Sequence, residues 1–132
     1  MVKLGDWAAR VNLTKLLITN HGNPMTLLAS DAPLITFSKI AVSPPTGAFL
    51  QATRDEEAVL QALISEVAGS ECHFVDLFAG CGTQSLPLLD QAAGLLAVEQ
   101  NGVALAALKA GADAAGLGGR VSVKERRLIQ AP

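Results

Sequence analysis

Residues 74–84 read FVDLFAGCGTQ, an apolar run that contains Asp76 and leads into two glycines, Gly80 and Gly82. Glycine has no Cβ, so such a loop can turn tightly and let its backbone approach a bound molecule. A second carboxylate, Glu99, follows 23 residues after Asp76 and closes another apolar run. In nucleotide-binding folds, an acidic residue at about this distance accepts hydrogen bonds from the ribose hydroxyls. The spacing indicates a nucleotide site; the alternative is a glycine turn in a ligand-free α/β domain.

The glycine pattern narrows the kind of nucleotide. A dinucleotide fingerprint requires G-x-G-x-x-G, and Ser85 occupies the position of the third glycine. The phosphate-binding pattern G-x-x-x-x-G-K-[ST] does not occur in the sequence. What remains is D-x-F-x-G-x-G-T, followed by an acidic residue after the next apolar run. This combination resembles the first motif of methyltransferases that use S-adenosylmethionine.

The elements that must position these residues alternate between helices and strands. Thr53 and Glu56 form a T-x-x-E capping box ahead of apolar residues at helical spacing, which predicts a helix that ends at Gly69. After it we expect a strand at 73–78, a helix at 83–92, a strand at 95–99, a helix at 102–115 and a strand at 120–124. A β-α-β-α-β unit requires a parallel sheet, with ligands at the carboxyl ends of its strands. The fold class predicted is α/β, with a partial Rossmann-like sheet.

The first part of the chain has a different pattern. Residues 11–50 contain short apolar and β-branched clusters separated by NHGNP, SDAP and SPPTG, which are turn signals. We expect short antiparallel strands there. The predicted organisation is a small β-rich N-terminal portion at 1–52, followed at 53–132 by the N-terminal half of a cofactor-binding domain.

Composition excludes some classes and leaves others open. No apolar stretch of the 132-residue sequence approaches the roughly 18 residues of a membrane span. The two cysteines form no disulfide framework and no secretory leader opens the chain, which favours a cytoplasmic protein. Residues 1–54 carry a net charge of +3 and residues 55–132 a net charge of −5. A mildly positive front fits a chain that meets a polyanion with one end.

A second stretch carries a resemblance to one family. Residues 44–53, PPTGAFLQAT, and the loop DLFAGCGT about 25 residues later resemble the RNA 5-methyluridine methyltransferases, over residues 45 to about 128. The resemblance implies S-adenosylmethionine as cofactor and tRNA or rRNA as partner. In that family the counterparts of Gln51, Phe78, Thr83 and Glu99 contact the cofactor. The expected cofactor-binding residues are Gln51, Asp76, Phe78, Gly80, Gly82, Thr83 and Glu99; alternatively, Phe78 belongs to the core and Gln51 to the surface.

The sequence also departs from that family. Its members attack the uracil with a cysteine and remove a proton with a carboxylate, both on later strands, whereas this sequence ends at Pro132. We therefore expect an incomplete copy of an RNA uracil-C5 methyltransferase with no catalytic residue of its own and doubtful activity alone. Cys81 lies between two glycines and is a poor substitute. The family has an acidic or amide residue near the adenine where this sequence has Arg127. The alternative function is a non-catalytic module that binds S-adenosylmethionine or RNA.

Two further expectations concern metals and assembly. His21 lies in a turn and His73 opens a strand, and neither has partner ligands at metal spacing, so no metal site is predicted. In the sheet of this family, the strand at 73–78 pairs with a fourth strand that this sequence lacks. Its segment HFVDLF carries no lysine or proline to protect a free edge. We expect self-association through that edge, as a homodimer.

Overall fold

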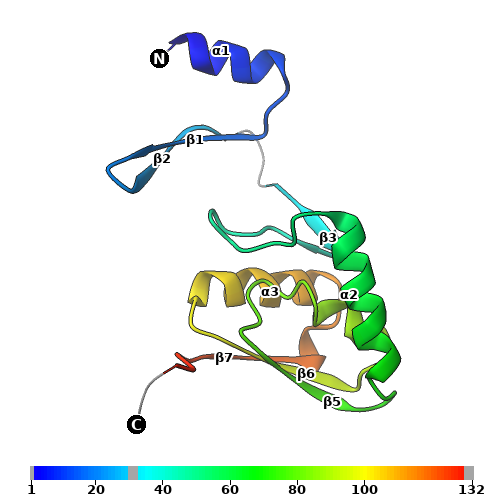
Figure 1. The fold of residues 1–132 in the computed structure, drawn as a ribbon. Helices are drawn as coiled ribbons and strands as arrows, with labels where there is room; N and C mark the ends of the chain where they lie inside the picture. Colours follow the sequence, from blue (N-terminus) through cyan, green and yellow to red (C-terminus); the bar gives the residue numbers. More distant parts are fainter. Residues whose placement is uncertain (1, 30–32, 130–132) are drawn as a thin grey trace. The chain divides into compact units, whose positions relative to one another are not determined.

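The computed structural model describes residues 2–29 and 33–129. They form two compact units, residues 1–34 and 35–132, which are considered separately (Figure 1). The boundary predicted after residue 52 refers to the start of a cofactor-binding domain and stays a prediction. No helix in the described ranges is both long enough and apolar enough to cross a membrane.

The first unit contains one helix and a hairpin. Strands β1 (Lys15–Asn20) and β2 (Asn23–Ala29) pair antiparallel, as the sequence predicted. His21 and Gly22 connect them with positive φ angles of 48° and 84°, as in the two-residue turns that suit a hairpin twist. Helix α1 (Val2–Arg10) was not predicted, although Leu4, Trp7 and Ala8 lie at helical spacing.

The second unit contains the parallel sheet. Strands β5 (His73–Leu77), β6 (Gly94–Glu99) and β7 (Val121–Glu125) pair in parallel in the order β5-β6-β7. The predicted α/β class and parallel sheet are confirmed. The central strand β6 is largely buried, and His73 packs against Gly94, where a Cβ would lie only 2.8 Å from the imidazole Cδ2. Because the strand order is β5-β6-β7, strand β5 lies at an edge of this sheet.

Helix α3 (Gly102–Ala114) lies between the sheet and a second hairpin (Figure 1). That hairpin consists of β3 (Ile35–Phe37) and β4 (Ile40–Val42), paired antiparallel. Gly111 allows the close approach, because a Cβ there would lie 2.8 Å from the carbonyl oxygen of Ala41. The core is apolar and includes Phe37, Ile40, Val42, Leu105 and Leu108. The β3–β4 hairpin therefore packs as part of the same body as the sheet.

The α-helix predicted at 83–92 was wrong. The segment forms a short 3-10 helix, η1 (Leu86–Asp90), with Pro87 in its first turn. Proline has no N–H, so it cannot donate to the carbonyl of Thr83, four residues earlier. The side chain of Gln61 donates to that carbonyl instead, at 2.8 Å. An α-helical turn over these residues is thereby replaced by a contact with the preceding helix.

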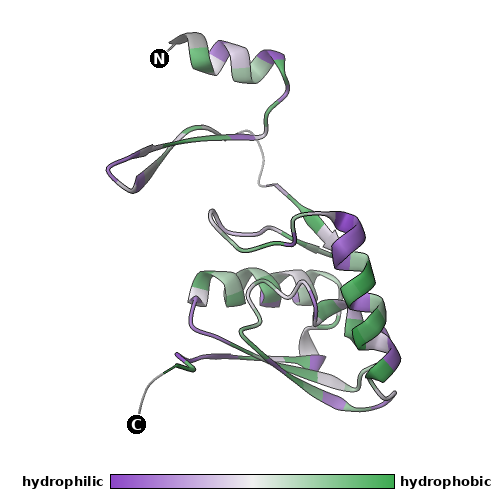
Figure 2. Ribbon diagram, in the orientation of Figure 1, coloured by the Kyte–Doolittle hydropathy of each residue, from purple (hydrophilic) through white to green (hydrophobic). Residues whose placement is uncertain are grey.

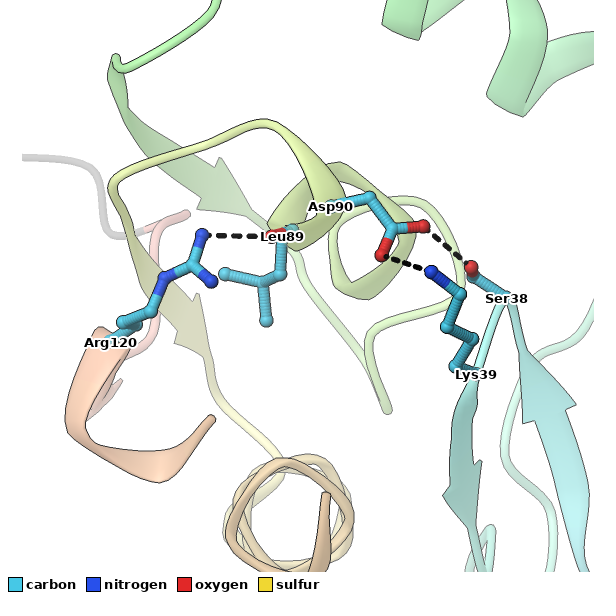
Figure 3. Close-up of polar contacts among 5 residues, drawn as sticks. All are labelled: Ser38, Lys39, Leu89, Asp90 and Arg120. Carbon is cyan, nitrogen blue, oxygen red and sulfur yellow. Dashed lines mark hydrogen bonds and ion pairs between the residues drawn. The ribbon is translucent and has the colours of Figure 1, made fainter. Parts of the chain in front are cut away.

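Polar contacts at both sides hold η1 in place (Figure 3). The Ser38 hydroxyl donates to Asp90 Oδ2 at 2.8 Å, and Lys39 Nζ lies 3.3 Å from Asp90 Oδ1. The Ser38 hydrogen bond, helped by Lys39, lowers the pKa of the Asp90 carboxyl below its usual value. From the other side, the Arg120 guanidinium donates to the carbonyl of Leu89 at 2.8 Å. These contacts connect the β3–β4 turn, η1 and the start of β7.

Helix α2 (Arg54–Val67) begins where the capping box predicted. Thr53 has extended backbone angles, and its side chain accepts a hydrogen bond from Glu56 N at 3.1 Å. The first turn contains Asp55, Glu56 and Glu57, whose charges are favourable at a helix N-terminus. None of the residues of α2 is fully buried, so the cap contributes a larger share of its stability than it would in a core helix.

We predict that Thr53→Ala lowers the free energy of unfolding by about 1 kcal/mol, because it removes the acceptor for Glu56 N. Thr53→Ser keeps a hydroxyl at this position and is the matched control. Its free energy of unfolding is expected to be nearly that of the parent. Urea denaturation followed by circular dichroism measures both. Equal stability of the alanine variant and the parent would show that the cap contributes nothing.

Candidate functional site

A cavity of about 370 Å³ opens at the carboxyl ends of β5 and β6. Its size lies at the lower end of the range of roughly 300 to 1,000 Å³ that is usual for small-molecule sites. Three segments line it: the loop before α2, the loop after β5, and the residues that join β6 to α3. Six of the seven residues expected to bind a cofactor line this cavity, namely Gln51, Asp76, Phe78, Gly80, Thr83 and Glu99.

The seventh expected residue, Gly82, lies beneath the cavity and does not line it. Its φ is +90°, and a Cβ there would lie 2.7 Å from Leu86 Cγ and 3.0 Å from Leu108 Cδ1. Gly80 differs, because a Cβ at that position would meet nothing within 4 Å even though its φ is +54°. Gly82 thus brings the loop onto the core, while Gly80 leaves backbone open toward the cavity.

The Glu99 carboxylate organises this end of the sheet. Its Oε2 accepts from Gly80 N at 3.1 Å, and its Oε1 accepts from Gln100 N at 2.8 Å and Asn101 N at 2.9 Å. Asn101 then caps α3 by accepting from Val103 N and Ala104 N. A single side chain therefore joins the loop after β5 to the start of α3.

Two phenylalanines stand at the rim of the cavity. Phe78 follows β5 with a φ of 64° and is 61% exposed, and Phe49 is 82% exposed. A positive φ is uncommon for a bulky residue and marks a strained position. The exposure of Phe78 argues against the alternative that it is a core residue. Gln51 is half-buried and lines the cavity beside Phe49.

Asp76 lies deeper along β5 than Phe78 and lines the same cavity. Partial burial raises the pKa of its carboxyl above the usual value, and the charge of Glu99 adds to this increase. The hydroxyl of Ser85 opposes it, although Ser85 Oγ falls outside hydrogen-bond geometry with any described partner. The cavity is therefore lined by two carboxylates whose negative charges repel each other.

Neither cysteine suits a nucleophilic role at this site. Cys81 lines the cavity but is only 1% exposed, and burial raises the pKa of its thiol further above the usual range. The reactive form of cysteine is the thiolate, so Cys81 is held in its unreactive form. Cys72 is exposed but precedes β5, at the opposite end of that strand from the cavity.

The remaining sequence expectations fall outside the cavity. Arg127 is exposed and does not contribute to the lining. The described residues contain no cluster of three His, Cys, Asp or Glu side chains that could hold a metal ion.

Sequence reasoning missed Gln84, which lines the cavity and has a buried amide. It lies one residue past the glycine motif and matched no pattern.

Comparison with curated proteins finds similarity to RNA methyltransferases that are themselves uncharacterized. One from Brucella suis is 39% identical over 100 residues, which are 76% of this chain and 24% of the relative. One from Zymomonas mobilis is 35% identical over 128 residues, 96% of this chain and 31% of the relative. The chain thus spans about a quarter to a third of the length of these relatives. No family model matches it.

Solved structures show the same fold. Pyrococcus horikoshii TYW2 in complex with MeSAdo superposes with a TM-score of 0.67 at 20% identity, over 92% of this chain and 45% of that one. The Pyrococcus abyssi tRNA (uracil-54, C5)-methyltransferase in complex with S-adenosyl-L-homocysteine gives 0.63 at 13% identity, over 80% of this chain and 27% of that one. The chain therefore shares its fold with part of these solved structures.

The two loop glycines predict different costs on substitution. Gly80→Ala places a Cβ in open space, so only the left-handed backbone is penalised, by about 1 to 2 kcal/mol. Gly82→Ala adds a clash with Leu86 and Leu108, and overpacking of a core costs about 1 to 3 kcal/mol more. We expect Gly82→Ala to unfold at clearly lower urea concentration than Gly80→Ala. The reverse order would contradict the packing described for the loop.

Proposed function

We propose that this chain forms the first part of the cofactor site of an S-adenosylmethionine-dependent RNA methyltransferase that acts on C5 of uracil. One observation carries the proposal: a single cavity collects Gln51, the glycine loop and Glu99, which lie far apart in the sequence. The similarity to curated RNA methyltransferases supports the class of enzyme. The motif resemblance of residues 44–53 and 76–83 supports uracil C5 as the target.

The residues of the cavity fit an adenosyl cofactor. Gly80 presents open backbone, as close approach of a ligand requires, and Phe78 presents an exposed ring at the rim. Glu99 provides a carboxylate for ribose hydroxyls, while Gln51 and Thr83 add polar groups at the lining. S-adenosylmethionine, when bound, supplies an activated methyl group. The chain's own residues bind and orient that cofactor.

The hydrogen bonds of Glu99 refine its proposed role. Three backbone N–H groups already occupy the carboxylate, two of them on Oε1 and one on Oε2. A carboxylate has about four acceptor positions. Oε2 therefore keeps one position for a ribose hydroxyl, and a second hydroxyl has to share an oxygen with a backbone donor. Glu99 acts in this proposal both as ligand contact and as the group that shapes the loop.

We assign no catalytic residue within the chain. Attack on uracil needs a thiolate near the cofactor, and the burial and raised pKa of Cys81 argue against that role. This observation favours the second candidate function for the chain by itself, a non-catalytic module that binds the cofactor or RNA. The RNA partner, tRNA or rRNA, is proposed from the family resemblance, and the net charge of +3 on residues 1–54 is compatible with it.

The proposal predicts that S-adenosylhomocysteine binds and that Glu99→Ala weakens the binding by about 2 to 4 kcal/mol. The estimate rests on one or two charge-assisted hydrogen bonds of roughly 1.5 to 3 kcal/mol each, partly replaced by water. Isothermal titration calorimetry measures the affinity. Glu66→Ala is the matched control, because it removes the same kind of side chain from an exposed position of α2 that does not line the cavity.

Because Glu99→Ala also removes acceptors from the loop, circular dichroism has to show that the variant is folded before its affinity is interpreted. A folded Glu99→Ala protein that binds as tightly as the parent would refute the ribose assignment. No binding of S-adenosylhomocysteine by the folded parent would refute the proposed function.

We also propose that the isolated chain self-associates through the free edge of β5. Within the described residues β5 pairs only with β6, and its Val75 and Leu77 are 61% and 55% exposed. Strands of parallel sheets are usually covered on both faces. Helix α2 adds exposed apolar residues at four-residue spacing, Val59, Leu63 and Val67. Figure 2 shows that hydrophobic and hydrophilic segments alternate along this helix. A second copy, paired edge to edge by two-fold symmetry, satisfies the open hydrogen-bonding groups of β5.

Light scattering tests this proposal. At micromolar concentration we expect a mass of twice the 13.6 kDa of one chain. Val75→Lys places a charge on the free strand and should shift the mass toward the monomer, since lysine on an edge strand opposes pairing. Lys at an exposed site outside this surface, such as Gln100→Lys, is the control for added charge. A folded parent that is monomeric contradicts the proposal.

A further inference from the structure

The carboxyl end of β7 carries a group of cationic side chains. Lys124, Arg126 and Arg127 lie within four consecutive residues, and all three are exposed. Neither of the ion pairs found among the described residues includes any of them. We call these three residues the β7 cations. Water alone can hydrate such charges, or an anionic partner can bind them, and their position in the fold distinguishes the two cases.

The carboxylate within the same segment, Glu125, faces away from the β7 cations. Its Oε2 occupies the space that a Cβ on Gly102 would need, so the side chain packs against the first residue of α3. A negative charge is favourable at a helix N-terminus. Lys124 lies on the other face of the sheet, since neighbouring side chains of a strand alternate between faces. Glu125 is therefore placed to compensate the start of α3 and not the β7 cations.

The β7 cations lie next to the cavity of the proposed cofactor site. Glu99, which lines that cavity, pairs with Glu125 in the parallel sheet, and its carbonyl oxygen accepts from Arg126 N at 2.8 Å. Neighbouring strands lie about 5 Å apart, so the backbone of Arg126 is about one strand spacing from that of Glu99. None of the β7 cations lines the cavity itself. Their side chains therefore stand beside the cavity and not inside it.

The opposite flank of the cavity carries the opposite charge. Helix α2 lies beside β5, because Ile64 of α2 shares a small cavity with Phe74 of β5. Since the strand order is β5-β6-β7, α2 and the β7 cations stand on opposite sides of β6. The first turn of α2 contains three acidic residues, Asp55, Glu56 and Glu57. A polyanion that approaches the cavity is therefore attracted on the β7 side and repelled on the α2 side.

The chemistry of the β7 cations selects a kind of polyanion. Guanidinium groups bind phosphates through paired hydrogen bonds, and lysine adds a point charge. An extended chain advances about 3.3 Å per residue, so the group extends over roughly 10 Å and can contact neighbouring phosphates of one strand. Because it is exposed and extended, it suits a long chain of phosphates better than a small anion, which needs an enclosed site.

We propose that Lys124, Arg126 and Arg127 bind the phosphate backbone of RNA and lead it past the cofactor cavity on the β7 side. The inference rests on the proposed function and extends it by naming the face over which the RNA lies. The contact is electrostatic and independent of the RNA sequence, because phosphates carry no sequence information. It is also separate from the net charge of +3 on residues 1–54.

Fluorescence anisotropy with a short fluorescein-labelled oligouridylate tests the inference. We expect the parent to bind this probe with an affinity that falls as salt rises. The double variant Arg126→Gln/Arg127→Gln keeps side chains of similar length without their charge. Each phosphate contact to a single strand contributes about 0.7 to the slope of log K against log salt, so the double variant should lower that slope by about 1.4 and weaken binding by roughly tenfold or more at about 0.1 M salt.

Two controls accompany the double variant. Arg54→Gln removes the same kind of charge from an exposed site at the start of α2, on the acidic flank, and should keep the affinity and salt slope of the parent. S-adenosylhomocysteine should bind the double variant as tightly as the parent, because neither arginine lines the cavity. Circular dichroism checks the fold, which we expect to persist since the hydrogen bond from Arg126 to Glu99 involves backbone atoms.

The outcomes that overturn the inference are distinct from those that refute the proposed function. Equal binding of oligouridylate by the double variant and the parent overturns it, as does no binding by the folded parent or an equal loss in Arg54→Gln. Polyglutamate that binds as tightly as oligouridylate, with the same dependence on the two arginines, overturns it in favour of an acidic protein partner. In these cases binding of S-adenosylhomocysteine by the parent leaves the proposed function standing. If the folded parent binds no S-adenosylhomocysteine, the proposed function fails and the inference fails with it.

Discussion

The second unit depends on the set of hydrogen bonds that the Glu99 carboxylate accepts. Its three donors belong to two segments, Gly80 in the loop after β5 and Gln100 with Asn101 before α3. Hydrogen bonds to a charged acceptor are about twice as strong as neutral ones, so this side chain fixes both segments relative to the sheet. Any loss at Glu99 would release the loop and the N-terminus of α3 together.

The loop needs this restraint because its backbone is unfavourable by itself. Phe78, Gly80 and Gly82 all have positive φ, and a non-glycine residue in that region is strained. The opposite side of the loop is held by Gln61 of α2, which donates to the carbonyl of Thr83. Beneath it, Gly82 packs on Leu86 and Leu108 without room for a side chain. Strain at the rim is therefore balanced by contacts with the helix, the strand end and the core.

The sequence could predict those parts of the fold that depend on local rules. The capping box at Thr53, the two-residue turn at His21 and the parallel strands follow from residue type and spacing. The 3-10 form of η1 was not predicted, although Pro87 in its first turn is visible in the sequence. The contact of Gln61 with the carbonyl of Thr83 spans 22 residues and does not follow from local rules. Helix α1 was missed because its apolar spacing covers little more than two turns. Within the site, Glu99 and the glycines could be predicted from their spacing in the sequence. Gln84 could not, because only the structure shows that its amide is buried.

The carboxylates of Glu99 and Asp76 differ in their roles because their surroundings differ. Glu99 is surrounded by backbone donors, so its charge is compensated within the protein and it can hold the loop with or without a ligand. Asp76 has no such donors, and Ser85 is not placed to make a full hydrogen bond with it. Its charge is therefore left unbalanced in a partly buried position. A site arranged in this way is held together at the Glu99 end by the protein's own hydrogen-bond donors, whereas no Lys or Arg among the residues that line the cavity compensates the charge at the Asp76 end.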